Sequence, residues 1–370
     1  MHYTCFSCDR RYPITERRFR CDCGGFLTLS TSDFFTRHAL EMRDYTIWRY
    51  RETFGLPADA EPVSLGEGRT PLIRRRIEGE EVALKLDFLQ PSGSFKDRGA
   101  SVLMTLVKYL EVGAIVEDSS GNAGAAMAAY AAAAGIDCTI FSPGYTPDGK
   151  LVQIRLYGAQ VRKVPGTRQD ANDAVIRAAE GAFYASHLWN PFFCQGLATT
   201  AYELWEQMGG RVPPAVIVPV GSGGYLEGLF IGFRALMRAG YTDAMPRLIG
   251  IQADHCAPLH LAWTRGLNDY VEIEPQPTVA EGIAVQRPPR APAVLAAIRE
   301  SGGCTIGVSE AEILDATRVL LRLGLCAEPT SAATLAGWRK LSAAERRGAV
   351  LILTGNGLKQ TTRLGELFVA

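Results

Sequence analysis

From about residue 63 onward, the sequence alternates short apolar runs with longer stretches of helical pattern. The run "AIVEDSS" is followed by "AGAAMAAYAAAAG", "CTIFSPG" by "KLVQIRLYGA", and "AVIVPV" by "YLEGLFIGFRALMRAG". Short apolar runs bounded by turn residues are typical of buried strands, and strands that alternate with helices form parallel sheets covered by helices on both faces. The rhythm therefore predicts an α/β fold.

The residues that follow four of the expected strands are small and rich in glycine. "QPSGSFK" follows "ALKLDFL", "SGNAG" follows "AIVEDS", "GSGGYLEG" follows "AVIVPV", and "TGNG" follows "AVLIL". Ligands of doubly wound sheets bind beyond the carboxyl ends of the strands. We therefore expect the four loops to converge on one crevice.

The first 30 residues differ from the rest and contain four closely spaced cysteines, Cys5, Cys8, Cys21 and Cys23. "CFSC" and "CDCGG" each predict a tight turn whose thiolates point at one ion, and the residues between them leave room for a hairpin. This pattern predicts a zinc ribbon in which four protein ligands give the ion a structural role. The alternative is a set of reduced cysteines with no ion.

Charge and hydropathy exclude several classes of protein. Lys+Arg and Asp+Glu both number 39, so no excess positive charge favours nucleic acid or anionic membranes. The longest apolar stretch is too short and too rich in alanine to span a bilayer, and the first residues have no signal pattern. We expect a cytoplasmic protein.

The glycine-rich turn Gly221, Ser222, Gly223, Gly224 lies between an expected strand and an expected helix, where backbone N–H groups form a cradle for an anion. It lacks the lysine and hydroxyl of a nucleotide P-loop, so the phosphate of a small cofactor fits better. Lys96 could condense with an aldehyde, Asn122 could bind a ring hydroxyl, and Thr354 could face a ring nitrogen. Together these groups meet the requirements of pyridoxal 5′-phosphate. Taken singly, they could be a surface lysine, a turn residue and a strand-end cap.

Five stretches resemble the threonine synthase family: "LGEGRTPLI", "PSGSFKDRGA", "SSGNAGAAMAAYAAAAGI", "CAEPTSAATLAG" and "LTGNGLK". The resemblance runs from about residue 60 to 360 in the family's order. It implies a pyridoxal-phosphate-dependent lyase of fold type II, with two doubly wound parallel-sheet domains of the tryptophan synthase β-like architecture and a small zinc ribbon. It also implies a homodimer that acts on a small amino-acid substrate.

The expected domain bounds follow from this architecture. They are a zinc-ribbon-like segment at 1–30, a helical connector at 31–60, a large cofactor-binding domain formed by 61–98 and 190–370, and a small mobile domain at 99–189 that carries the Asn122 loop.

The resemblance further implies a role for each candidate residue. Lys96 would be the Schiff-base lysine and the general base, Asn122 would lie near the cofactor O3′, and Thr354 at the pyridine nitrogen, while 221–224 would hold the phosphate. Ser119, Ser120 and the backbone up to Ala123 would bind the substrate carboxylate. A neutral hydroxyl at the ring nitrogen favours prompt loss of a leaving group, so elimination or replacement at the β or γ carbon is expected.

The sequence departs from the family where a second phosphate, that of O-phosphohomoserine, would bind. Ala123 stands in place of a hydroxyl residue, His187 and Leu188 in place of Asn-Ser, and Phe193 in place of Arg. Losing charge-assisted hydrogen bonds of roughly 1.5–3 kcal/mol each would make O-phosphohomoserine a poor substrate. The alternatives are a β-replacement synthase, cysteate-synthase-like or making another unusual amino acid, a serine/threonine ammonia-lyase, and a catalytically silent metal-binding scaffold. The aromatic residues of "SHLWNPFF" are either core residues or part of the substrate pocket.

Overall fold

The computed structural model describes residues 1–30, 35–37, 40 and 44–369. These residues form two compact units. Unit 1 comprises Met1–Gly68 and Lys96–Leu197, and unit 2 comprises Arg69–Phe95 and Ala198–Ala370. The chain therefore changes unit at the peptide bond between Phe95 and Lys96 and again inside a single helix, α5 (Pro191–Gln207).

Unit 1 begins with a three-stranded antiparallel sheet in the order β2-β1-β3. Its strands are β1 (His2–Cys5), β2 (Arg11–Pro13) and β3 (Leu27–Leu29). A 3-10 helix, η2 (Ile47–Thr53), follows. Part of the predicted helical connector at 31–60 lies outside the described residues.

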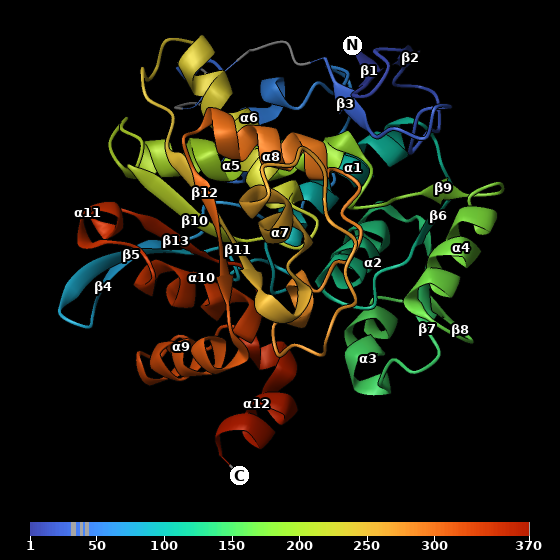
Figure 1. Cartoon of the computed structure of the whole chain (residues 1–370). Helices are drawn as coiled ribbons and strands as arrows, with labels where there is room; N and C mark the ends of the chain where they lie inside the picture. Colours follow the sequence, from blue (N-terminus) through green and yellow to red (C-terminus); the bar gives the residue numbers. More distant parts are fainter. Residues whose placement is uncertain (31–34, 38–39, 41–43, 370) are drawn as a thin grey trace. The chain divides into compact units, whose positions relative to one another are not determined.

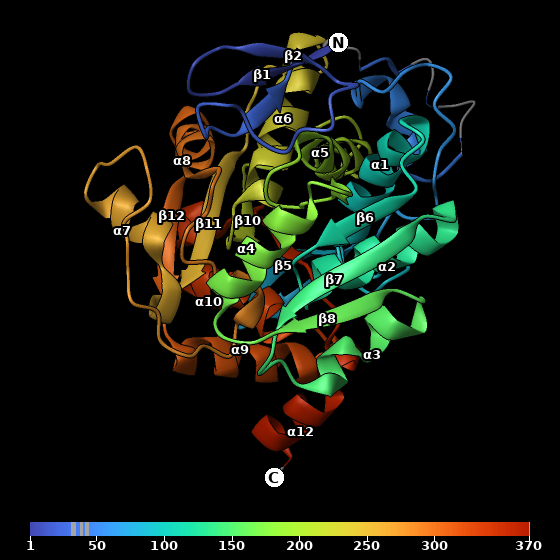
Figure 2. The same cartoon turned by 90° about the vertical axis from the view of Figure 1, so that its right-hand side faces the viewer.

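The larger sheet of unit 1 has four strands in the order β8-β7-β6-β9, and all of its pairings are parallel, as the sequence rhythm predicted. Figure 2 shows β6, β7 and β8 side by side, and α2, α3 and α4 pack against this sheet. The elements are α1 (Lys96–Tyr109), β6 (Ala114–Glu117), α2 (Asn122–Ala134), β7 (Asp137–Pro143), α3 (Asp148–Leu156), β8 (Gln160–Val164), α4 (Arg168–Ala178) and β9 (Phe183–Tyr184).

The alanine-rich helix α2 illustrates how sequence determines local structure here. Alanine has the highest helix propensity, and its small side chain lets the helix pack closely against its neighbours. The helix ends at Gly135, which takes the left-handed conformation (φ 70°) that glycine adopts without a steric penalty. At its start, a Cβ on Gly124 would lie 1.8 Å from the carbonyl oxygen of Ser119. The loop after β6 can therefore lie directly on the first turn of the helix.

Unit 2 contains a six-stranded sheet in the order β12-β11-β10-β13-β5-β4, parallel except for β4. Figure 1 shows α6 and α8 on one side of this sheet and α9 and α10 on the other. The strands are β4 (Leu72–Ile77), β5 (Glu80–Leu86), β10 (Ala215–Pro219), β11 (Arg247–Ala253), β12 (Cys304–Val308) and β13 (Val350–Leu353). The helices are α6 (Gly224–Arg238), η3 (Asp254–Cys256), α7 (Pro258–Thr264), η4 (Glu281–Ile283), α8 (Ala291–Glu300), α9 (Glu310–Arg322), α10 (Pro329–Arg339), α11 (Ala343–Arg346), η5 (Gly357–Gln360) and α12 (Thr361–Phe368).

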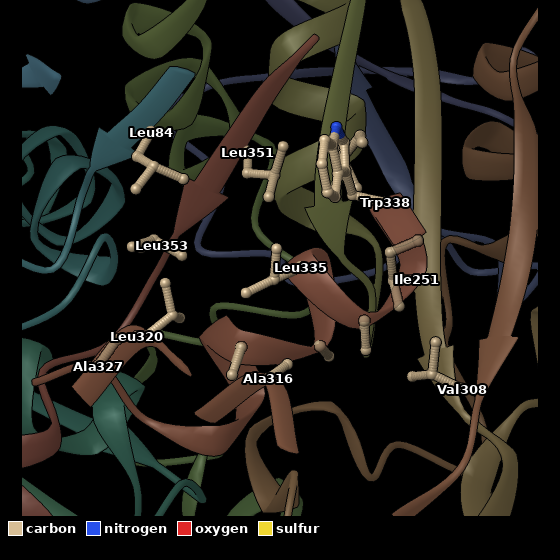
Figure 3. Close-up of a cluster of buried hydrophobic side chains, with 14 of the residues drawn as sticks. Leu84, Ile251, Val308, Ala316, Leu320, Ala327, Leu335, Trp338, Leu351 and Leu353 are labelled. Carbon is tan, nitrogen blue, oxygen red and sulfur yellow. The ribbon is translucent and has the colours of Figure 1, made fainter. Parts of the chain in front are cut away.

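The core of unit 2 lies between this sheet and α10 (Figure 3). Trp338 is almost fully buried there, together with Leu351 of β13 and Ile251 of β11. A Cβ on Gly337 would lie 2.3 Å from the side chain of Ile251, so the helix can approach the strand this closely because position 337 is glycine. The packing fixes α10 against the central strands β10, β11 and β13, with Ser331 at the end of β13.

Within the part of the chain that the structure describes, no helix combines the length and the apolar character needed to cross a bilayer.

Candidate active site

Three of the four glycine-rich loops belong to unit 2 and lie at one edge of its sheet. They follow β5, β13 and β10, which are adjacent parallel strands, so their carboxyl ends point the same way. The loop before Lys96 is hydrogen-bonded to the loop after β13: the Phe95 N–H donates to the carbonyl of Thr354 at 3.0 Å, and the Asn356 N–H donates to the carbonyl of Gly93 at 3.0 Å. Ser94 also pairs with Gly355 in an isolated bridge. The loops after β5 and β13 are thus in direct contact.

The glycine turn at 221–224 joins β10 to the start of α6. Gly223 caps the helix with φ 85°, and a Cβ there would lie 2.3 Å from the side chain of Val294. A Cβ on Gly221 would lie 3.0 Å from Cα of Ile283. Side chains are excluded at both positions, which leaves backbone N–H groups at the positive end of a 15-residue helix. This turn fits a phosphate group.

Thr354 is buried and lies next to a serine that sequence reasoning missed. The Oγ of Ser331, in α10, accepts hydrogen bonds from the N–H groups of Thr354 and Gly355, both at 2.9 Å, and lies 3.2 Å from the Thr354 Oγ1. The pattern "EPTSAAT" alone does not identify Ser331, because most hydroxyls at a helix start are caps. The two hydroxyls together form an uncharged polar group at the end of β13.

Phe95 packs against Tyr225, which belongs to a second polar cluster that the sequence did not reveal. Its ring stacks on that of Tyr225, with centroids 4.4 Å apart and an interplanar angle of 12°. The Tyr225 hydroxyl donates to the buried carboxylate of Asp87, which also accepts a bond of 2.7 Å from Thr70. These contacts hold the residue before Lys96 in place.

The hydroxyl of Ser94, in the same loop, is buried and has no hydrogen-bond partner among the described residues. Buried polar groups in native proteins nearly always have a partner. An orphaned hydroxyl two residues before Lys96 is therefore what a loop shaped around a polar ligand would contain.

Lys96 is the first residue of α1, and its amine is desolvated. Burial lowers the pKa of the Lys96 amine to about 8, while Glu117 and Cys194 oppose part of this shift. The ring of Phe193 lies 5.8 Å from Nζ. Phe193 itself packs on the helix backbone, since a Cβ on Gly99 would lie 2.6 Å from its ring. A lysine with a lowered pKa is neutral part of the time near physiological pH, and a neutral amine is the form that attacks an aldehyde.

The loop after β6 forms the start of α2 and holds the remaining predicted residues. The Gly121 N–H donates to the Oγ of Ser119 at 3.3 Å, and Asn122 begins the helix. Ser120 and Asn122 are half-buried, whereas Ala123 is buried. The hydroxyls and the N–H groups of the helix start are thus gathered at one end of α2, which suits a carboxylate. Lys96 and this loop belong to unit 1, and the glycine turn and Thr354 belong to unit 2.

A buried carboxyl–imidazole pair adjoins Lys96 in unit 1. Glu117, the last residue of β6, places Oε1 2.6 Å from Nδ1 of His187, and its side chain is 0% exposed against 11% for His187. Burial raises the pKa of Glu117 well above its usual range, and burial with the nearby positive charge of Lys96 lowers that of His187. Sequence analysis noted His187 but missed Glu117, because an acidic residue that ends a strand gives no sign of its partner.

The sequence left open whether the aromatic residues of "SHLWNPFF" are core residues or part of the substrate pocket, and the structure separates them. Phe192 packs edge-on against Tyr3 of the ribbon, with centroids 5.9 Å apart, and Trp189 packs against Phe19 at 6.1 Å. These contacts favour a core role for both. Phe193 instead lies beside the Lys96 amine.

The four cysteines of the ribbon come together as predicted. The sulfur atoms of Cys5, Cys8, Cys21 and Cys23 all lie within 4.8 Å of one another, with Cys5–Cys23 at 3.5 Å and Cys8–Cys21 at 3.6 Å. Four sulfurs placed 2.3 Å from a tetrahedral zinc ion would be about 3.8 Å apart. A hydrogen bond from Tyr12 lowers the pKa of the Cys21 thiol to about 6, whereas burial raises that of Cys5 to about 12, so of these two thiols Cys21 more readily takes the thiolate form that binds metal. The residues fit a zinc ion.

Comparison with known proteins identifies the family of this chain. A family model described as pyridoxal-phosphate dependent enzyme matches residues 63–355. The threonine synthase of Methanocaldococcus jannaschii is 36% identical over 96% of this chain and 92% of its own length. That of Methanosarcina acetivorans is 34% identical over 92% of this chain and 86% of its own.

Solved structures show the same fold. A threonine deaminase from T.th. is 27% identical with a TM-score of 0.67, covering 78% of this chain and 92% of its own. The maize serine racemase has a TM-score of 0.69 at 22% identity, covers 82% of this chain and 92% of its own, and supports the fold alone. The findings confirm the predicted fold type and the predicted threonine-synthase-like lyase class. The chain belongs to the family of pyridoxal-phosphate-dependent enzymes.

Proposed function

We propose that this protein eliminates or replaces a group at the β or γ carbon of an amino acid, in the manner of a threonine synthase, with Lys96 as the residue that binds the cofactor covalently. The observation that carries the proposal is the desolvated Lys96 amine, whose pKa is about 8, directly after a loop that is hydrogen-bonded to the Thr354 loop. A surface lysine would be solvated and would have no such support.

Each of the other predicted groups has a matching role toward the cofactor. The N–H groups of 221–224 would hold its phosphate, Asn122 would bind the ring hydroxyl, and the Thr354 hydroxyl, paired with Ser331, would face the ring nitrogen. The orphaned Ser94 hydroxyl supports a polar ligand next to these groups. Pyridoxal phosphate, when bound, withdraws electrons from the α-carbon of an amino acid and makes its proton labile.

The chain's own residues would then direct the reaction. Lys96, which is neutral part of the time because its pKa is lowered to about 8, accepts the α-proton as general base. Ser119, Ser120 and the start of α2 bind and orient the substrate carboxylate. The uncharged Thr354–Ser331 pair would not protonate the ring nitrogen. Because an unprotonated ring stabilises negative charge poorly, departure of a leaving group is favoured.

A second candidate within this class is a β-replacement synthase or ammonia-lyase that acts on a substrate other than O-phosphohomoserine. It is favoured by Phe193, an apolar ring beside the Lys96 amine at the position where the family resemblance predicts an arginine. A phosphate dianion would have no charge-assisted partner at this position.

The first experiment tests the cofactor and its attachment. The purified holoenzyme should be yellow, and borohydride reduction followed by peptide mapping should find the pyridoxyl group on Lys96. Lys96→Ala should abolish the label and turnover, whereas Lys108→Ala, an exposed lysine on the same helix, should leave both unchanged. A label on another lysine, or none, contradicts the proposal.

The second experiment separates the two candidates by substrate. O-phosphohomoserine should release phosphate and form threonine if the protein is a threonine synthase. L-serine or L-threonine should yield ammonia and a 2-oxo acid if it is an ammonia-lyase.

A further inference from the structure

The Glu117–His187 pair has no role in the proposed reaction steps. Lys96 takes the α-proton, and the loops after β6, β10 and β13 bind the cofactor and the carboxylate. Yet the pair lies in unit 1 beside Lys96. The rings of His187 and Phe193 are 6.1 Å apart, and the same Phe193 ring lies 5.8 Å from Lys96 Nζ. Lys96 also interacts electrostatically with both Glu117 and His187.

Asp118 and Arg168 also act electrostatically on the pair, but Asp118 has hydrogen-bond partners of its own. Asp118, the next residue, is held by the Tyr184 hydroxyl at 2.8 Å, by Asn172 at 3.0 Å and by Arg168 at 3.3 Å. Its charge is therefore matched by that of Arg168. Glu117 has only His187 as a hydrogen-bond partner among the described residues, and its second oxygen, Oε2, is buried without one.

A carboxyl and an imidazole in this setting share one proton. Burying two charged groups, or one carboxylate alone, costs desolvation free energy. A pair that holds a single proton carries no net charge and avoids most of this cost. The directions of the two pKa shifts agree, since burial favours the neutral form of each group. His187 is the more exposed member, so it is the one closer to the surface of the unit.

We propose that His187 is the catalytic acid that protonates the leaving group of the substrate, that Glu117 is the positioning residue that holds and resupplies its proton, and that the leaving group is a hydroxyl. This inference rests on the proposed function and deepens it, because it selects β-hydroxy amino acids, L-serine or L-threonine, as the substrate class.

Lys96 takes the α-proton, and the electron pair of the Cα–H bond forms a Cα–Cβ double bond. The Cβ–O bond breaks with its electrons on oxygen, and the His187 proton joins that oxygen, so that water leaves. Hydrolysis of the unsaturated amino acid gives ammonia and a 2-oxo acid. One proton passes from the Lys96 ammonium back to the pair and completes the cycle.

The chemistry of the leaving group explains why such a pair would be present. Hydroxide leaves poorly unless it is protonated, and a positioned acid contributes about 10²–10⁴-fold to such a step. Phosphate leaves without a proton and instead needs cationic partners, and the Phe193 ring provides none at this place. A neutral proton donor beside an apolar ring suits a hydroxyl.

The test compares leaving groups in the holoenzyme. His187→Asn should lower kcat for the hydroxy amino acid by about 100-fold or more but change turnover of β-chloro-L-alanine, whose chloride needs no proton, by less than about threefold. Glu117→Gln should lower kcat for the hydroxy amino acid less, and should shift the alkaline limb of its pH profile. His260→Asn, a partly buried histidine in unit 2, is the matched control and should change neither substrate.

The outcomes separate this inference from the proposed function. The inference is overturned if His187→Asn lowers kcat equally for both substrates or for neither. It is also overturned if the wild type turns over β-chloro-L-alanine but no hydroxy amino acid. Each of these results is compatible with a cofactor attached to Lys96. Absence of the Lys96 label would instead overturn the proposed function. If His187→Asn does not fold, Glu117→Gln, which keeps the side-chain shape, provides the same comparison of the two substrates.

Discussion

Gly196 and Gly365 offer a matched test of how closely α1 and α5 approach each other in unit 1. Both glycines lie inside helices, and replacing glycine by alanine in a helix interior ordinarily stabilises a protein by about 0.5–1 kcal/mol. A Cβ on Gly365 would meet nothing within 4 Å. A Cβ on Gly196 would lie 2.1 Å from the carbonyl oxygen of Arg98, on the turn of α1 that begins with Lys96.

The expected effect of Gly196→Ala follows from these contacts. The obstructing atom belongs to the backbone, so the helices must separate, and overpacking of this kind costs about 1–3 kcal/mol. After the gain in helix propensity, we expect a net loss of about 1 kcal/mol. For a unit of this size that lowers the melting temperature by about 2–4 °C. Gly365→Ala should raise it by about 1–4 °C.

Calorimetry of the holoenzyme, together with cofactor content, measures both variants. Gly196→Ala should also weaken cofactor retention, because the displaced turn carries Lys96. If Gly196→Ala is as stable as Gly365→Ala and retains its cofactor, the close approach of α1 and α5 described here is wrong.

Two further predictions concern the ribbon and the lysine. Cys8→Ser should lower the zinc content, measured by atomic absorption, from one ion per chain to a small fraction. Cys138→Ser, which lies outside the ribbon, should retain the full ion. Equal zinc contents in both variants would contradict a four-thiolate site. In the apoprotein, the rate at which Lys96 reacts with pyridoxal phosphate should rise about tenfold per pH unit up to about 8 and then level off, because the neutral amine is the reactive form and its pKa is lowered to about 8. A rate that still rises between pH 9 and 10 would show an ordinary lysine.

Local patterns predicted much of the fold. The strand "AVIVPV" and the helix after it appear as β10 and α6, and Gly135 ends α2 as expected. The antiparallel strand β4 was not predicted, because "LIRRRI" has three consecutive arginines and no alternation of apolar and polar residues. It forms through pairing with β5, an interaction between segments that local periodicity does not encode.

The residues of the candidate site also differ in whether a local motif could predict them. Lys96, the glycine turn and Thr354 could be predicted because each stands in a distinctive local motif at a strand end. Ser331 and Glu117 could not, since their meaning lies in a partner far along the chain: Thr354 for one, His187 for the other. Pairings of this kind depend on tertiary packing.

The strand β4 lies at the edge of the six-stranded sheet, and its backbone could in principle accept a strand from another molecule. Its three arginines, Arg74 to Arg76, are exposed. A second copy aligned there would place like charges side by side, and this repulsion protects the protein from edge-to-edge aggregation at high concentration. The outer edge of this sheet is thus protected by three consecutive arginines.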